Sequence, residues 1–245
     1  MTVDTQYFMT GASADEVWPL IRDFHYSRRM PSAIIHSFAY REAGGLFGDT
    51  GSVVACCVYG APVNRSWPPE SLELKRLVRN DKFTKPLSKF VSWSLRWLKA
   101  NTEVPFVLSY ADSGQGHHGG IYQATGFSYV RTSKGDSAFM DSMGNYIHGK
   151  TVFNRYGTRS SEKILKLNPT WSVVRDSDKY LYVRPLRQKK KSLLKKFGWQ
   201  ELPYPKPDYA SRPLDEPLPC GVSQVQPLGD APNSNVDTQT ETRQD

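Results

Sequence analysis

The sequence has 245 residues, of which 38% are hydrophobic and 12% are aromatic, and its formal net charge is +8. This composition supports a folded core and excludes a chain that is disordered throughout. The chain has no run of about 18 apolar residues, no N-terminal stretch of the signal-peptide kind, and three cysteines whose spacing matches neither a disulfide framework nor a zinc site. We therefore expect a globular protein that spans no membrane and works in a reducing compartment, the cytoplasm.

The first predicted element is a helix that begins near residue 14. Ser13 and Glu16 have the spacing of a capping box, and apolar residues at helical spacing follow them. Two strands, 34–40 and 52–59, come next and are separated by a glycine-rich turn. We expect these two strands to pair as antiparallel neighbours.

The segment 72–79 alternates with period two and is predicted to be a third strand. The alternation places Arg76 on the same face as Leu72, Leu74 and Val78, where an unpaired guanidinium would be costly. The remaining predicted elements are a helix at 86–100, a buried strand at 106–110, a short helix at 120–125 and a strand at 127–130. This order predicts an α/β fold with a mixed central sheet and flanking helices.

Charge and proline content divide the chain into three parts. Residues 1–186 contain the predicted elements and are expected to form one domain. Residues 187–197 carry six positive charges and are interpreted as a clamp on a DNA backbone rather than a merely solvated charge run. Residues 198–245 contain eight prolines and end in a polar run, which predicts a largely disordered tail. Residues 1–198 carry a net charge of about +13, which fits either a polyanion partner, with nucleic acid as the first candidate, or a merely soluble basic surface.

The richest polar stretch runs from Tyr110 to Gln123, at the carboxyl end of a predicted central strand. In open α/β sheets, ligands bind beyond such strand ends. Asp112, His117 and Tyr122 offer a carboxylate, an imidazole and a phenol for acid–base chemistry, and the glycines allow close approach to a substrate. We predict that this loop is functional, although a polar glycine-rich loop is often only a turn.

A second polar cluster, residues 24–31, follows the first helix. His25 either caps that helix as a cation or faces the same crevice as the loop after residue 110. In the second case His25, Asp112 and His117 would form a two-histidine, one-carboxylate set, the ligand type of non-haem ferrous iron. The phosphate loop, the dinucleotide fingerprint and the nucleophile elbow are all absent from the sequence, which excludes ordinary kinases, dinucleotide oxidoreductases and serine hydrolases.

Several longer strings resemble one protein family. They lie at 7–10, 16–20, 24–33, 46–49, 72–79, 90–101 and 110–126. Over most of residues 7–190 the sequence resembles the Mom DNA-modification family of Mu-like phages. The resemblance implies a fold similar to the Gcn5-related N-acetyltransferases, whose glycine-containing loop binds the pyrophosphate of coenzyme A. The corresponding connection here, residues 80–86, has no glycine.

The resemblance also implies an activity: conversion of adenine in DNA to N6-carbamoylmethyladenine, which protects a phage genome from restriction in the cytoplasm of an infected bacterium. The implied partners are double-stranded DNA with the adenine flipped out and a small-molecule donor, either acetyl-coenzyme A or another acetamide donor. Ordinary acyl transfer leaves a carbonyl on nitrogen, whereas this product is attached through carbon. Redox chemistry at a non-haem iron ion is one route to that bond. A homodimer is compatible with this activity.

For this activity we predict roles for the polar residues. The expected catalytic residues are Asp112, His117, Tyr122, Tyr26 and Tyr110. The expected cofactor-binding residues are Arg76 and Ser109, and the expected DNA-binding residues are Arg28, Arg29, Lys189, Lys190 and Lys191. Two rival functions stay open: an acetyl-coenzyme A-dependent N-acetyltransferase that acts on a small amine or a protein, and a non-enzymatic basic DNA-binding protein that masks sites by occupancy.

Overall fold

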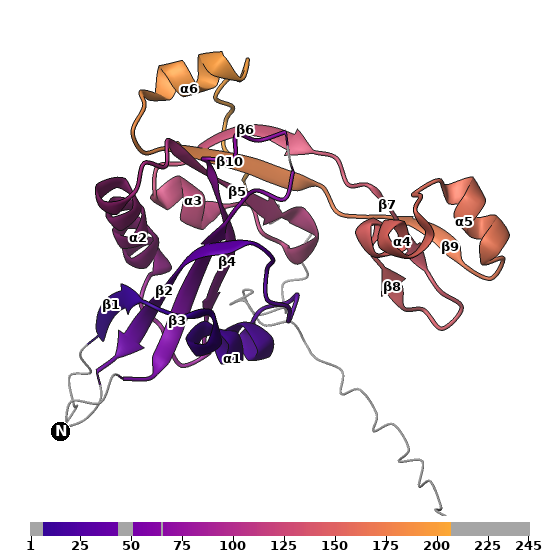
Figure 1. Ribbon diagram of the computed structural model, residues 1–245, viewed down its shortest axis with the longest axis horizontal. Coiled ribbons are helices and arrows are strands. Elements are labelled where there is room, and N and C mark those ends of the chain that lie inside the picture. The colour runs from indigo at the N-terminus through magenta and orange to yellow at the C-terminus, as the bar shows by residue number, and fades with distance from the viewer. Residues whose placement is uncertain (1–6, 44–50, 65, 207–245) are drawn as a thin grey trace, which may run out of the picture.

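The computed structural model describes residues 7–43, 51–64 and 66–206 (Figure 1). Its main sheet has seven strands in the order β1-β2-β3-β4-β5-β10-β6. Their bounds are β1 Tyr7–Gly11, β2 Ile34–Glu42, β3 Val53–Gly60, β4 Leu72–Arg79, β5 Phe106–Asp112, β6 Ser128–Ser133 and β10 Lys179–Pro185. Because β4 and β5 pair in parallel and the other neighbours pair antiparallel, the predicted mixed sheet is confirmed.

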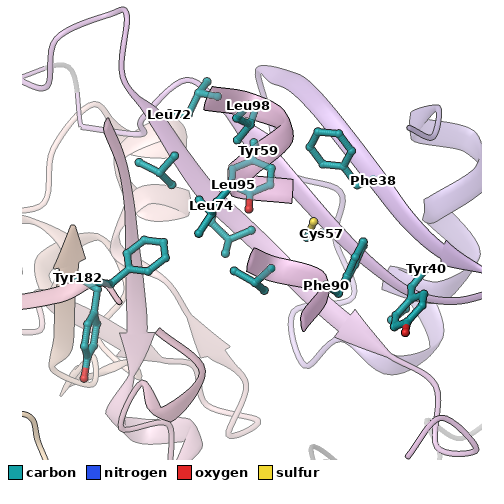
Figure 2. Packing of buried hydrophobic residues seen from close by; sticks show 14 of the residues in the cluster. Phe38, Tyr40, Cys57, Tyr59, Leu72, Leu74, Phe90, Leu95, Leu98 and Tyr182 are labelled. Atoms are coloured by element: carbon teal, nitrogen blue, oxygen red, sulfur yellow. The ribbon is translucent and has the colours of Figure 1, made fainter. Parts of the chain in front are cut away.

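Helices cover both faces of this sheet. On one face α1 (Ala14–Phe24) packs Val17 and Ile21 against β3, and its N-terminus has the predicted Ser13–Glu16 capping box. On the other face lie α2 (Leu87–Asn101) and α3 (Gly120–Ala124). Figure 2 shows the α2 side chains packed on β2 and β3 residues in the largest apolar cluster. No helix in the described ranges is long and apolar enough to cross a membrane.

A β-bulge in β4 changes the face on which Arg76 lies. Leu74 is opposite Tyr59 on β3, but Arg76 is opposite the adjacent residue Val58, so β4 carries one extra residue between the two pairs. The bulge restarts the alternation, which places Arg76 and Val78 on the α1 face while the preceding leucines stay on the α2 face. The prediction that Arg76 shares a face with core leucines was therefore wrong, because simple period-two counting cannot detect a bulge.

Strands β4 and β5 separate along their length. In these fully described strands, the pairing joins Leu72 to Val107 and Glu73 to Leu108 and does not continue. By contrast, β10 pairs with β5 along all seven residues. The buried Ser109 hydroxyl donates to the carbonyl of Leu74, with 2.9 Å between the oxygens, at the point where the strands separate. The sheet therefore opens at the carboxyl end of β5 but keeps one intact edge there.

The connection between β6 and β10 forms a small lobe (residues 134–178) that the pattern analysis did not predict. It contains the strands β7 (Ser137–Met140), β8 (Tyr146–Ile147) and β9 (Ser172–Arg175), and the helices α4 (Gly149–Tyr156) and α5 (Ser161–Leu167). Its apolar cluster is built on Phe139, Val152 and Ile164, separate from the clusters of the main sheet. Figure 1 shows the lobe standing away from the sheet, in pink and orange.

The chain after β10 folds back onto the main sheet. Helix α6 (Lys190–Lys196) buries Leu193, and Trp199 stacks on Phe197 with 4.6 Å between ring centroids. Tyr204 donates from its hydroxyl to a backbone carbonyl of the sheet region. Residues 198–206 thus lie against the domain, although we predicted that the tail begins at 198, because their aromatic side chains bury apolar surface. The rest of that tail, 207–245, and the string 46–49 lie outside the described residues.

Candidate functional site

Polar and aromatic side chains gather where β4 and β5 separate. They come from the loop after α1, from β4, from the end of β5 and the loop that follows it, and from α3. The members are His25, Tyr26, Glu73, Arg76, Asp112, His117 and Tyr122. The structure therefore brings together the two polar clusters that the sequence analysis placed at the ends of different elements.

The loop after α1 is strained and is held in place from β4. Arg28 and Ala33 have φ angles of 44° and 53°, in the left-handed region that costs a non-glycine residue about 1 kcal/mol or more. The Arg76 guanidinium donates twice to the carbonyl oxygen of Arg29, from Nε at 3.2 Å and from Nη2 at 3.1 Å. Because the bulge turns Arg76 to this face, β4 can fix the loop that carries His25 and the neighbouring tyrosine.

His25 is a neutral ring in the site. Its Nδ1 accepts from the backbone N–H of Ser27 at 3.0 Å, and its ring stacks on Tyr26 with 4.3 Å between centroids. Burial lowers the pKa of His25 to about 3, with further lowering by the charges of Arg76 and His117. The residue ends α1 through its backbone, but at neutral pH its side chain is not the cation that a charge cap requires.

Tyr26 and His117 form an exposed aromatic surface beside this ring. Their rings meet edge to face, with 6.1 Å between centroids, and Tyr26 is 43% exposed. Desolvation lowers the pKa of His117, while the charge of Asp112 opposes that shift. Desolvation and the same carboxylate raise the pKa of Tyr26. At neutral pH the site therefore presents an uncharged imidazole and a protonated phenol.

Asp112 ends β5 and organises the loop that follows it. Its Oδ1 accepts from the backbone N–H of Gly114 at 3.0 Å and from the hydroxyl of Ser177. Its Oδ2 lies 3.5 Å from Nζ of Lys179. The carboxylate therefore joins the β5 loop to the base of the lobe, and its charge acts on the His117 imidazole.

The predicted iron ligands do not assemble into a metal site. In the part of the chain that the structure describes, no three His, Cys, Asp or Glu residues are grouped so as to hold a metal. The Asp112 carboxylate is bonded to Gly114 and Ser177, and Nδ1 of His25 is bonded to Ser27. The ligand set of His25, Asp112 and His117 is therefore not supported, because His25 and Asp112 already accept hydrogen bonds from other groups of the protein.

Three further predicted site residues, Tyr122, Ser109 and Tyr110, have different surroundings. Burial raises the pKa of Tyr122 to about 12, and the Ser109 hydroxyl opposes that shift. Ser109 itself is buried and donates to a β4 carbonyl, so its hydroxyl links β5 to β4 where the two strands separate. Tyr110 follows it on β5 and therefore points to the opposite face, where it packs near Trp67. Tyr122 belongs to the cluster around Tyr26, whereas Tyr110 packs with the apolar cluster of the other face.

Gly119 is required for the position of α3. Its φ is 82°, and a Cβ there would lie 2.4 Å from the ring of Tyr182. The Tyr182 hydroxyl donates to the carbonyl of His118 at 2.6 Å, which closes the loop on β10. The glycine thus allows the close approach that places Tyr122 at the opening of the sheet.

The sequence analysis did not select Glu73. Burial raises the pKa of its carboxyl group, which accepts from the backbone N–H of Val63 at 3.0 Å. Its charge also acts on Tyr122 and Arg76. Within an alternating strand, a glutamate between two leucines is typical of a solvated face. Only the separation of β4 from β5 shows that this carboxyl group borders the site.

The predicted DNA-binding residues lie at two ends of β5. Arg28 and Arg29 are exposed on the loop beside Tyr26. In the β5–β10 pairing, Lys179 is opposite Asp112 and Pro185 is opposite Phe106. The Lys189–Lys191 run follows Pro185 and therefore belongs to the end of β5 away from the site. The structure does not bring the two predicted basic groups together.

The charges around the start of α2 favour an anionic group, although this segment lacks the glycines of a coenzyme A loop. Asn80 and the buried Phe83 close the preceding turn, and Pro86 caps the helix without a side-chain hydrogen bond. The first turn has no acidic residue. Three lysines border this terminus, at positions 82, 85 and 89, against one acidic residue, Asp81. Uncapped amides and nearby cations favour phosphate oxygens.

The comparisons with known proteins identify a family. The Mom protein family model matches residues 7–206. The Methylcarbamoylase mom of Escherichia phage Mu is 28% identical over 139 residues, which cover 55% of this chain and 56% of that protein. The alignment thus spans just over half the length of the phage protein.

Solved structures also align with the chain. Arabidopsis thaliana NAA60 in complex with acetyl-CoA has 10% identity and a TM-score of 0.47, covering 75% of this chain and 100% of that one. The ribosomal-protein-S18-alanine N-acetyltransferase from Escherichia coli has 6% identity and a TM-score of 0.44, covering 76% and 97%. The family model, by contrast, spans most of the sequence, including every residue of the candidate site. The chain belongs to the Mom protein family.

Proposed function

We propose that this protein is a DNA-modifying enzyme that transfers a carbamoylmethyl group to the exocyclic N6 of adenine. Membership of the Mom family over residues 7–206 and the name of the phage Mu relative support this activity. The basic composition supports a polyanionic substrate. In a phage-infected bacterium, the modification would hide restriction sites in the DNA within the cytoplasm.

The observation that carries the proposal is the half-exposed Tyr26 ring beside His117 at the opening of the sheet. Enzymes that act on a base in duplex DNA extrude the nucleotide and stack it on aromatic side chains. Tyr26 offers such a surface and is itself supported by the neutral ring of His25. The arrangement thus fits a flat heterocycle whose exocyclic amine points toward His117.

The residues of the site fit the proton transfer that this reaction needs. The N6 lone pair is conjugated with the adenine ring, so a base must remove a proton as the new N6–carbon bond forms. His117 is a neutral imidazole at pH 7, and the charge of Asp112 stabilises the imidazolium that results. His25, with a pKa of about 3, is too weak a base and instead supports Tyr26. The partly buried Tyr122 phenol stays protonated and can donate to the carbonyl oxygen of the transferred group.

The product constrains the donor. The methylene carbon of the acetamide bonds to N6, so the bond between that carbon and its leaving group must break, with the electron pair going to the leaving group. Plain acyl transfer from acetyl-coenzyme A forms a different bond. The uncapped start of α2 and its three lysines would hold phosphates if the donor carries them. Arg28 and Arg29 would contact DNA phosphates beside the site, whereas the Lys189–Lys191 run follows the other end of β5, away from the site.

Mass spectrometry of nucleosides tests the proposal. Plasmid DNA would be recovered from cells that express the wild type, His117→Gln or the control His36→Gln, and stripped of protein. His36 lies on β2 and packs against Phe38 and Trp97, outside the site. We expect adenosine with an added acetamide from the wild type and the control, and unmodified adenosine from His117→Gln. A plain acetyl adduct would support the acetyltransferase rival, and unmodified DNA that is protected only while protein is bound would support the binding rival.

A further inference from the structure

We propose that the lobe (residues 134–178) holds the DNA duplex beside the site, through backbone phosphates that contact the exposed cations of α4 and α5. The choice of DNA as the polyanion rests on the proposed function. The assignment of the lobe rests on its position, its charge and its exposed apolar side chains.

The base of the lobe is attached to the loop that carries Asp112. The Ser177 hydroxyl donates to the Asp112 carboxylate, and the backbone N–H of Ser113 donates to the carbonyl of Asp178 at 3.1 Å. Lys179, the first residue of β10, follows directly and lies opposite Asp112. The lobe therefore projects from the site end of the sheet, as Figure 1 shows. A duplex that contacts it would run past the opening between β4 and β5.

The two helices of the lobe carry an excess of positive charge. Residues 149–167 contain five lysines and arginines and one acidic residue, Glu162. Lys166 pairs with Glu162, and Arg159 pairs with Asp136. Within the described ranges, the other three cations form no ion pair, and all three are exposed: Lys150, Arg155 and Lys163. Such uncompensated cations are the usual partners of backbone phosphates.

One of these lysines, Lys150, acts electrostatically on Lys75 of the main sheet. The side chain of Lys75, on β4, donates from Nζ to the carbonyl of Ser32 at 2.7 Å. Burial lowers the pKa of Lys75, the charge of Glu73 opposes that shift, and the charges of Arg76 and Lys150 lower the pKa further. Like charges gathered from the lobe and from β4 repel each other. Glu73 is the carboxylate that acts on Lys75 among them, and a phosphate placed near these cations would add a second negative partner.

Apolar side chains lie among the cations. Phe153 on α4 is 48% exposed and Leu167 on α5 is 64% exposed. The guanidinium of Arg159 lies over the Phe153 ring, with 5.7 Å between Cζ and the centroid. This mixture suits DNA, whose sugars and phosphates alternate, better than a second copy of the chain, whose identical cations would repel.

The other basic segment differs in its contacts. On α6, Lys190 pairs with Glu201 at 2.8 Å, and Arg187 pairs with Glu103 at 3.1 Å. The helix is docked through the buried Leu193. This segment also lies at the Phe106 end of β5, away from the site. Residues 187–197 carry more positive charge per residue than the helices of the lobe. Their position nevertheless makes them the weaker candidate for holding DNA near the target base.

A pair of charge-matched variants tests the proposal. The lobe variant is Lys150→Glu/Arg155→Glu/Lys163→Glu, and the control is Lys189→Glu/Lys191→Glu/Lys195→Glu on α6. All six side chains are exposed, and both variants change the net charge by the same amount. Long-range attraction to DNA is therefore altered equally, so a difference between the variants measures local contact. Circular dichroism and melting temperature confirm that each variant is folded.

Duplex binding would be measured by fluorescence anisotropy over a series of salt concentrations. We expect the lobe variant to lose about tenfold or more in affinity and to lower the salt slope by roughly 3, since each phosphate contact contributes about 0.9. We expect the α6 control to change the slope by less than about 1. Equal losses in the two variants, or a wild type with no salt-dependent duplex binding, would overturn the proposal. A concentration-dependent dimer that only the lobe variant abolishes would assign the surface to a second copy instead.

The binding assay and the nucleoside analysis test different proposals, so either proposal can be contradicted while the other holds. A wild type that binds through the lobe but leaves adenine unmodified keeps this inference and overturns the proposed function. A wild type that modifies adenine while both variants bind equally keeps the proposed function and overturns the role of the lobe.

Discussion

The two ends of β5 have opposite surroundings. At the Phe106 end, Leu193, Phe197 and Trp199 close an apolar cluster beneath α6. At the Asp112 end, β4 no longer pairs with β5, and titratable side chains occupy the opening between the two strands. Pairing with β10 extends along the whole strand, so the open end keeps a rigid edge. One strand thus supplies apolar packing at one end and positions polar groups at the other.

The largest effect is expected at the open end. Changing His117 to Ala removes the proposed base, and we expect the rate of DNA modification to fall by about 100-fold or more. DNA binding should persist, because the change removes no cation at neutral pH. Single-turnover modification of a duplex and anisotropy on the same duplex measure the two properties. Equal losses of binding and chemistry would contradict this division of roles.

At the closed end, a core substitution should reduce stability and leave chemistry intact. Leu193 is fully buried, so Leu193→Ala is expected to lower the free energy of unfolding by about 2–5 kcal/mol. The rate per folded molecule should stay at the wild-type value, because the change lies at the far end of β5. Urea denaturation and modification assays at low temperature measure both quantities. A loss of rate in fully folded protein would show that the two ends are coupled.

A smaller effect is expected from the side chain that holds the strained loop. Arg76→Lys replaces a guanidinium group, which donates twice to the Arg29 carbonyl, with a single ammonium group. We expect about tenfold slower modification and a loss of roughly 1 kcal/mol in stability. Arg96→Lys on the exposed surface of α2 is the matched control. If both variants behave alike, Arg76 does not position the loop.

The last effect is absent at neutral pH, because it concerns how stability changes below pH 6.5. The folded pKa of His25 is about 3, below its ordinary value of 6.5, so the unfolded chain binds more protons between these values. Stability should therefore fall as the pH drops from 6.5 toward 3, by at most about 1.4 kcal/mol per pH unit from this residue. His25→Asn should reduce the slope in denaturation experiments between pH 7 and 4. If the free energy of unfolding has the same pH slope in the wild type and in the variant, the His25 ring is exposed to solvent and its pKa is not lowered by folding.

Local signals predicted much of the fold. The Ser13–Glu16 capping box, the apolar stripe of α2 and the antiparallel pair of β2 and β3 all appear as expected. Each depends on residues close together in the chain or on a strong period. The lobe was missed because its strands and helices are short, and short apolar runs give weak periodicity.

The candidate site was predicted in part. The stretch after β5 and the cluster after α1 were both selected, because glycines, histidines and carboxylates stand out against apolar neighbours. The iron ligand set was not supported, since no sequence pattern shows that Ser177, 65 residues away, bonds to Asp112. Glu73 was missed because its strand looks like an ordinary amphipathic one.

The sequence by itself determined the α/β class, the family resemblance and the stretches that form the candidate site, because these depend on residue types and their local spacing. Only the tertiary structure decided which of those groups meet. The bulge that turns Arg76, the separation of β4 from β5 and the contact between Asp112 and the base of the lobe all join segments far apart in the chain. Such contacts follow from how whole elements pack, and local spacing carries no record of them.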